Sequence, residues 1–220
     1  MKYANIDERG AVLGWYDPAI HKAIPTPYVE VSDETWRKAI DLGANAYANN
    51  EFVRRQWGPQ SKEEAQFAIK AAAAGAIEGA YPIHKQLNLQ ADSSYAQNAI
   101  AGLTGLTGDE VMQRAVSKVG LTDDPEALKA ARDQVEELDL ADIVADIPSR
   151  LALAFPPAQV QFMASLIDGY FRTLVVCICG YRLIRLVRIW SNQKEVELAA
   201  LTELAALEAF DPAGGCPDIA

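Results

Sequence analysis

The chain has 220 residues, half of them apolar, which is enough to bury a core as one domain or as two small ones. Its formal net charge of -10 argues against a nucleic-acid-binding protein, because such affinity comes from neutralising phosphates. Three cysteines without a regular spacing, and a start that lacks an apolar run of signal-peptide length, are typical of a reducing cytoplasm rather than export.

The first 50 residues predict a small β module that leads into a helix. Two short runs rich in aromatic and β-branched residues flank Gly10, which can adopt a positive φ in a hairpin turn. A further run can add another strand, and Ser32 can cap a helix whose first turn carries Asp33 and Glu34. We therefore expect strands within residues 2–7, 11–16 and 28–31 and a helix from Asp33 toward Ala48.

Aromatic side chains are the candidate partner-binding residues of this module. Isolated hairpins are marginal in water, so Trp15, Tyr16 and Trp36 should bury against one another or against a partner protein. A private small core is the plainer of these two interpretations. His21 lies in the loop after the hairpin, and we interpret it as a turn or contact residue rather than a catalytic base.

Three motifs follow one another at close spacing in the first 36 residues. They are the hairpin from Tyr3 to Pro18, the loop Ile20-His21-x-x-Ile24-Pro25, and the helix entry Val29-Glu30-Val31-Ser32-Asp33-Glu34-x-Trp36. Their order resembles the amino-terminal module of bacteriophage tail-fibre assembly proteins. The phrase Tyr81-Pro82-x-x-Lys85-Gln86-x-Asn88 is similar to one that often follows a helix in that family.

The resemblance implies a protein that works by protein-protein contacts. It would be a tail-fibre assembly chaperone, or a virion component that connects a fibre to the tail. Its partner would be a phage tail fibre or another tail protein. Its location would be the host bacterial cytoplasm during assembly, or the virion.

Residues 51–120 predict an Ala-rich helical region with a Gly-rich connector. Ser61 and Glu64 match a capping box, so we expect a helix from Ser61 to about Gly79. Gly102, Gly105 and Gly108 recur every third residue but lack the endings of phosphate-binding motifs. We interpret them as a flexible connector.

An acidic region follows. The run Asp123-Asp124-Pro125-Glu126 predicts a helix start, with a carboxylate cap, Pro125 in the first turn and Glu126 three residues after Asp123. The helix carries many carboxylates as far as Asp146 against only Lys129 and Arg132. Its exposed face is strongly negative. The plain interpretation is a solvated surface, and the functional alternative is a surface that imitates nucleic acid.

A long apolar stretch runs from Ala158 to Trp190. Residues 171–181 could be a membrane span, a buried strand or a helix, although Asp168, Arg172 and Arg182 interrupt any clean membrane-spanning run. Small residues at intervals of four favour the helix, because they form a stripe where another backbone could approach closely. This helix-contact stripe comprises Ser165, Gly169, Thr173 and Cys177.

A basic amphipathic segment ends this stretch. Arg182, Arg185 and Arg188 lie on one side of the expected helix, and Trp190 lies with the apolar residues on another. The chain's own acidic region, a second copy, an anionic membrane or an acidic partner could satisfy it, and the first two need the fewest assumptions. We expect a last helix from Lys194 to Phe210, which is not a leucine zipper, and a frayed tail over 211–220.

Catalytic chemistry is poorly represented. With two histidines, His21 and His84, the chain has no metalloprotease or hydrolase motif and no Cys/His set for a metal. Cys177-x-Cys179 is one residue too close for a zinc knuckle, and neighbouring carboxylates are expected from composition alone. We therefore predict no catalytic residues, no metal and no cofactor.

The sequence as a whole predicts a mainly α protein with a small N-terminal β-hairpin or three-strand module, α+β overall. We divide it into a β-hairpin and helix module (1–50), an Ala-rich helical region (51–120), a helical bundle or oligomerisation region (121–210) and a flexible tail (211–220). The expected function is that of a non-enzymatic tail-fibre assembly factor or connector, as a homo-oligomer, without nucleic acid or membrane. The alternative is an acidic phage-encoded inhibitor of a host defence or regulatory protein.

Overall fold

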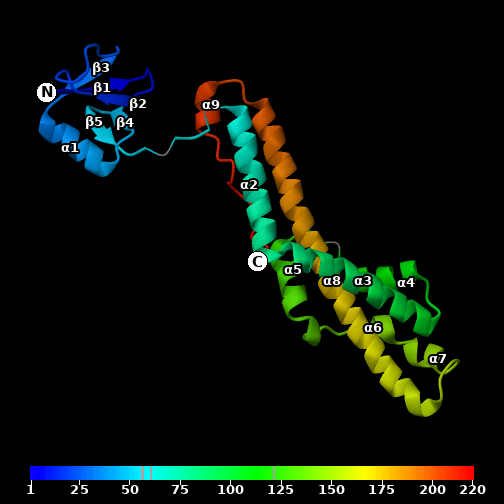
Figure 1. Cartoon of the computed structure of the whole chain (residues 1–220). Helices are drawn as coiled ribbons and strands as arrows, with labels where there is room; N and C mark the ends of the chain where they lie inside the picture. The colour runs from blue at the N-terminus through cyan, green and yellow to red at the C-terminus, as the bar shows by residue number, and fades with distance from the viewer. Residues whose placement is uncertain (56, 60, 121) are drawn as a thin grey trace. The chain divides into compact units, whose positions relative to one another are not determined.

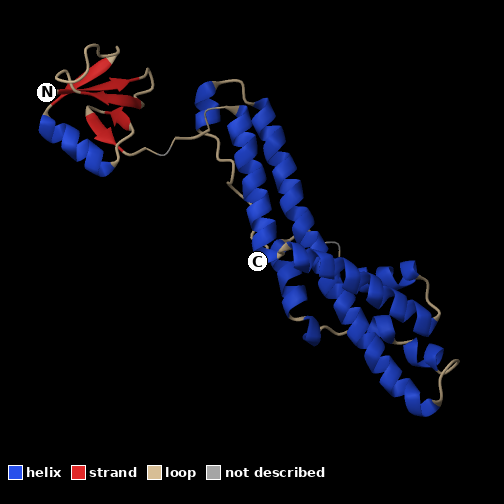
Figure 2. Ribbon diagram, viewed as in Figure 1, coloured by secondary structure: helices blue, strands red, loops and turns tan. Residues whose placement is uncertain are grey.

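The chain is mainly helical with a small N-terminal β module, as the sequence predicts (Figure 2). The computed structural model describes residues 1–55, 57–59, 61–120 and 122–220. It divides into two compact units, unit 1 (1–58) and unit 2 (59–220). Unit 2 contains most of both helical regions of the sequence analysis together with the tail. The boundary drawn between those regions adjoins residue 121, which lies outside the described residues.

Unit 1 is built on the predicted hairpin. Strands β1 (Lys2–Ile6), β2 (Val12–Tyr16) and β3 (Tyr28–Val31) form an antiparallel sheet in the order β2-β1-β3. Gly10 in the turn has a φ of +82°, and a Cβ atom there would lie 2.4 Å from the Tyr47 carbonyl oxygen. Glycine is therefore required at this position both by the backbone conformation and by the close approach of a neighbouring chain segment.

The helix of unit 1 is shorter than the sequence predicts. Helix α1 (Asp33–Leu42) begins as expected, because the Ser32 hydroxyl accepts a hydrogen bond from the Thr35 N–H at 3.0 Å. It ends at Gly43, which adopts the left-handed conformation that commonly terminates helices. The prediction that it reaches Ala48 is wrong. The following residues form a second hairpin, β4 (Ala46–Ala48) and β5 (Glu51–Val53).

The 44-residue helix α8 (Pro157–Ala200) is the long axis of unit 2 (Figure 1). Residues 171–181 are therefore helical, which decides between the strand and helix alternatives. Helix α2 runs antiparallel to the later half of α8, where Lys62 Nζ donates a hydrogen bond to the Ala199 carbonyl at 3.0 Å. Other helices pack against the rest of α8. The bounds of these elements are α2 (Lys62–Ala80), α3 (Ile83–Thr104), α4 (Gly108–Val119), α5 (Pro125–Asp133) and α7 (Ile147–Leu151).

The glycines between α3 and α4 form an ordered turn. Gly105 ends α3 at a φ of +70°, and Thr107 begins α4 with a reciprocal capping box to Glu110. Gln97 Nε2 donates a hydrogen bond to the Gly108 carbonyl at 2.9 Å, and Leu106 is buried. The prediction of a flexible connector is wrong, because caps and a buried leucine fix this turn.

The acidic region is not one continuous helix. Asp124 caps α5 with Pro125 in its first turn, as predicted, but α5 ends at Asp133. A 3₁₀ turn η1 (Val135–Glu137) and two short helices follow, α6 (Ala141–Val144) and α7. The Asp139 carboxylate accepts a hydrogen bond from the Ala141 N–H at 2.9 Å. This competition of an aspartate side chain for backbone N–H groups favours a break over a continued helix.

The C-terminal residues differ from the prediction in two ways. The expected helix over 194–210 is interrupted after Ala200, and a separate short helix α9 (Leu204–Glu208) follows. The tail is not frayed, because Ile219 is only 1% exposed and Trp190 Nε1 donates a hydrogen bond to the Gly214 carbonyl at 3.1 Å. The tail therefore covers the core of unit 2.

Helix α8 is long and apolar enough, over an 18-residue stretch, to cross a membrane by length and composition alone. Within unit 2, 39% of that stretch is buried. This property is weak evidence, since the core helix of a soluble protein meets the same test. That the chain does not enter a membrane stays a prediction.

Candidate interaction surfaces

The sheet of unit 1 has one covered face. Ala4 and Val31 on this face are buried. The Trp15 ring lies 4.8 Å from the Phe52 ring, centroid to centroid, and Lys2 Nζ lies 5.4 Å from the centroid of the Trp36 ring. Two of the aromatic residues that the sequence singled out therefore pack within unit 1.

The other face of the sheet carries tyrosines. Tyr3 and Tyr16 are direct cross-strand partners and so lie on the same face, and Tyr28 packs edge-on against Tyr3 with ring centroids 5.0 Å apart. His21 packs edge-on against Tyr16 at 5.2 Å. Tyr28 is 46% exposed and His21 is exposed. We call Tyr3, Tyr16, His21 and Tyr28 the tyrosine face.

Local hydrogen bonds fix the conformation of the loops that adjoin this face. His21 Nδ1 accepts a hydrogen bond from the Asp17 N–H at 3.0 Å, which fixes the loop as a turn. The buried Asn5 donates to the Pro25 and Pro27 carbonyls at 3.2 and 2.7 Å. The Glu30 carboxylate beside Tyr3 raises the pKa of the Tyr3 phenol, so this hydroxyl remains a hydrogen-bond donor at neutral pH. The face can therefore offer aromatic surface together with polar groups.

Sequence reasoning grouped Trp15, Tyr16 and Trp36, but the structure divides them between the two faces. It also left Tyr3 and Tyr28 out of the candidate site. Alternation orders the residues of one strand only, and the cross-strand register, which brings Tyr3 and Tyr28 to the face of Tyr16, is not given by it. Which face is covered depends on α1 and the second hairpin, which sequence alone did not reveal.

The basic segment of α8 does not pair with the acidic region of the chain. The Arg182 guanidinium donates a hydrogen bond to the Gly120 carbonyl. Arg185 and Arg188 are exposed and have no carboxylate within ion-pair distance in the described part of the chain. Trp190 is 7% exposed, so its role is packing against the tail rather than presentation to a partner.

Other cations neutralise part of the acidic region. The Arg114 guanidinium binds the Asp146 carboxylate through two nitrogens at 2.7 and 3.1 Å, and Arg150 Nε binds it at 2.6 Å. Lys118 pairs with Asp142, and further pairs join Arg132 to Asp133 and Arg172 to Glu136. Much of this negative charge is therefore compensated within unit 2.

Asp146 gives a pH prediction for unit 2. The hydrogen bonds from Arg114 and Arg150 hold its pKa well below the usual range. A carboxyl whose pKa is depressed on folding stabilises the fold above its unfolded pKa of about 3.9, and this contribution is lost as pH falls below that value.

We expect the Tm of Asp146→Asn to fall less between pH 7 and pH 3 than the Tm of the wild-type chain. The corresponding difference in the free energy of unfolding is on the order of 1 kcal/mol, because the carboxylate remains partly exposed. Thermal unfolding followed by circular dichroism measures it, with Asp123→Asn as the control. An unchanged pH dependence in Asp146→Asn would contradict this role.

The predicted helix-contact stripe faces a cavity over much of its length. Ser165, Gly169, Thr173 and Cys177 line a cavity of about 460 Å³ together with residues of α3 and η1. A Cβ atom built on Gly169 would meet nothing within 4 Å. Within this chain, the close helix contact expected there lies instead at Gly180, where a Cβ atom would come within 2.9 Å of Leu89.

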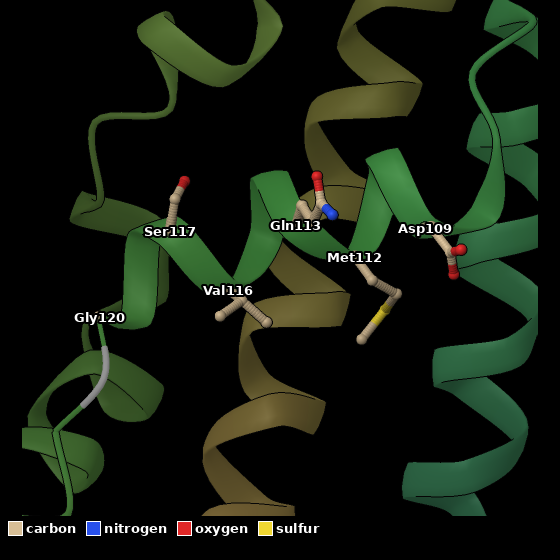
Figure 3. A pocket seen from close by; sticks show the side chains of 6 residues that line it. All are labelled: Asp109, Met112, Gln113, Val116, Ser117 and Gly120. Atoms are coloured by element: carbon tan, nitrogen blue, oxygen red, sulfur yellow. The ribbon is translucent and has the colours of Figure 1, made fainter.

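An open hollow of about 600 Å³ lies on the outer side of α4 (Figure 3). Met112 and Val116 project to the same side of the helix, and Asp109, Gln113, Ser117 and Gly120 complete the lining. Its walls come from one helix and carry no convergent set of polar groups. This geometry suits a contact surface better than a small-molecule site.

The cysteines lie in unit 2 without forming a metal centre. Burial raises the pKa of the Cys177 and Cys179 thiols to about 11, so both stay protonated at neutral pH. Among the described residues, no group of three or more His, Cys, Asp or Glu side chains could hold a metal ion.

Comparison with protein-family models, with curated proteins and with solved structures found no match to this chain. The resemblance to tail-fibre assembly proteins therefore rests on the quoted motifs alone.

Proposed function

We propose that this chain is a non-enzymatic phage tail protein, a tail-fibre assembly factor or a fibre-to-tail connector, that docks through unit 1. The motif order of the first 36 residues suggests the family. The tyrosine face carries the proposal, because aromatic side chains on a sheet held by a covered opposite face form a preorganised contact surface. Assembly factors need such surfaces to cover apolar parts of a fibre before it trimerises.

Co-expression with the carboxy-terminal fragment of a phage tail-fibre protein tests the proposal. We expect a soluble complex or an increased yield of fibre trimer, measured by affinity capture and by native gel. Failure of the fragment to bind or to gain solubility, with correctly folded protein on both sides, would contradict it.

The double variant Tyr3→Ser with Tyr28→Ser is expected to weaken fibre binding by about tenfold or more, because aromatic side chains dominate contact energies. Leu13→Ser is the matched control, since Leu13 is 63% exposed on β2 and is not a residue of the tyrosine face. Calorimetric titration measures the affinities. Equal loss in both variants would show that the tyrosine face is not the docking surface.

The alternative function, an acidic inhibitor of a host defence or regulatory protein, has less support. Its basis was a dense run of carboxylates on one helix. That run is broken into short elements, and Asp142, Asp146 and Glu136 pair with cations of unit 2. Salt-sensitive binding to a basic host protein, without any effect on a fibre, would favour the inhibitor.

A further inference from the structure

The later half of α8 has two different sides. One side packs in the core with α2 and the tail, and it carries the buried residues Leu183, Val187, Trp190 and Leu198. In the described part of the chain the opposite side has three exposed residues and one half-buried residue, Ile189. It carries Arg185, Ile189, Asn192 and Val196, which we call the outer face.

The outer face has the spacing of a coiled-coil seam, with apolar residues at its a positions and polar residues at its d positions. Its residues are spaced by four, three and four positions, which places Ile189 and Val196 at heptad a and Arg185 and Asn192 at heptad d. Val196 is 72% exposed. Most of these residues line an open hollow of about 490 Å³ along the helix. A β-branched pair at a positions, with Ile189 half-buried and Val196 exposed, favours a second helix as the occupant.

The charges beside this seam are self-complementary. Arg188 and Glu195 occupy the same heptad position, g, one heptad apart. Arg188 has no ion pair in the part of unit 2 that the structure describes, and Glu195 has only a 3.9 Å contact with Lys70. One edge of the outer face is therefore basic toward its N-terminal end and acidic toward its C-terminal end.

We propose that the outer face of α8 binds the same face of a second copy of this chain in antiparallel orientation. In an antiparallel pair, g positions meet g positions, so Arg188 of each copy faces Glu195 of the other, once on each side of a two-fold axis. In the same register Ile189 meets Asn192 and Arg185 meets Val196. A parallel pair would instead place Arg188 against Gln193 and leave its charge without a partner.

The seam is short, so the dimer is reversible rather than obligate. The helices need no ordering on association, because α2 already holds α8 in place on its other side. An apolar partner or a membrane would leave Arg188 unpaired and Glu195 with only its distant contact to Lys70. A second copy of this chain satisfies both signs with the residues already present.

Sedimentation equilibrium of the full chain over a wide concentration range tests the proposal. We expect a monomer-dimer equilibrium that Arg188→Glu weakens by about tenfold or more, because two like-charge contacts replace two ion pairs. Arg188→Glu combined with Glu195→Arg should return the dissociation constant close to the wild-type value. Lys85→Glu, the same charge change on the exposed surface of α3, is the matched control and should have little effect.

Val196→Asp provides a second variant that buries a charge in the seam, and it should also favour the monomer. Helical circular dichroism confirms that each variant is folded. A wild-type chain that stays monomeric at all concentrations would overturn the proposal. A dimer that neither Arg188→Glu nor Val196→Asp weakens would do the same, and failure of the double variant to restore the dimer would exclude the antiparallel pairing.

Discussion

Phe171→Ala is expected to lower the free energy of unfolding of unit 2 by about 3–5 kcal/mol. Phe171 is fully buried near the middle of α8, where that helix packs against several others. Removal of its ring loses apolar contacts and leaves a cavity that tightly packed neighbours fill only in part.

Phe162→Ala is the matched control on the same helix, because Phe162 is 66% exposed. Its effect should stay within about 0.5 kcal/mol. Urea unfolding followed by helical circular dichroism measures both. Trp190 is buried in unit 2, so its contribution to tryptophan fluorescence follows the unfolding of that unit, whereas Trp15, Trp36 and Trp57 lie in unit 1. Similar losses in both variants would contradict the assigned burial of α8.

Gly180→Leu is expected to destabilise unit 2 by about 1–3 kcal/mol through overpacking. A Cβ atom at Gly180 would lie 2.9 Å from Leu89 Cδ1 and 3.2 Å from Tyr81 Cε1. Both neighbours are buried, so the remaining atoms of a leucine would have to displace them.

Gly169→Leu, on the same helix, should instead raise the free energy of unfolding of unit 2. The position faces open space, and leucine has a higher helix propensity than glycine by up to about 1 kcal/mol. Thermal unfolding of both variants under identical conditions compares them. If Gly169→Leu destabilised unit 2 and Gly180→Leu had no effect, the close contact would lie at the stripe that the sequence suggested. The contact seen at Gly180 would then be refuted.

Local signals in the sequence predicted the starts of elements well. The hairpin at Gly10, the cap at Ser32 and the start of α5 at Asp124 each depend on residues a few positions apart. The predicted ends of the elements were less accurate than their starts. A helix ends where a glycine, a side-chain cap or tertiary packing provides a better set of hydrogen bonds. The breaks after Leu42, Asp133 and Ala200 are of this kind.

The candidate surfaces were predicted only in part. Tyr16 and His21 lie on the tyrosine face, whereas Trp15 and Trp36 lie on the covered one. Arg185 and Arg188 are exposed, and the pairing with the chain's own acidic region is absent, because cations of α4 and the first half of α8 occupy carboxylates of that region. Residue type indicated that these side chains could bind something, and spatial neighbours determined which remain exposed.

The sequence by itself determined a mainly helical chain with a small β module at its start, because turn glycines, helix caps and apolar periodicity act over short distances along the chain. Only the tertiary structure decided that the tail and Trp190 are structural, that Gly180 rather than Gly169 is a close contact, and which side of α8 stays exposed. These outcomes depend on which distant segments bury one another. The hydrophobic effect is non-directional, so the sequence shows which side chains are apolar but not which segment will cover them.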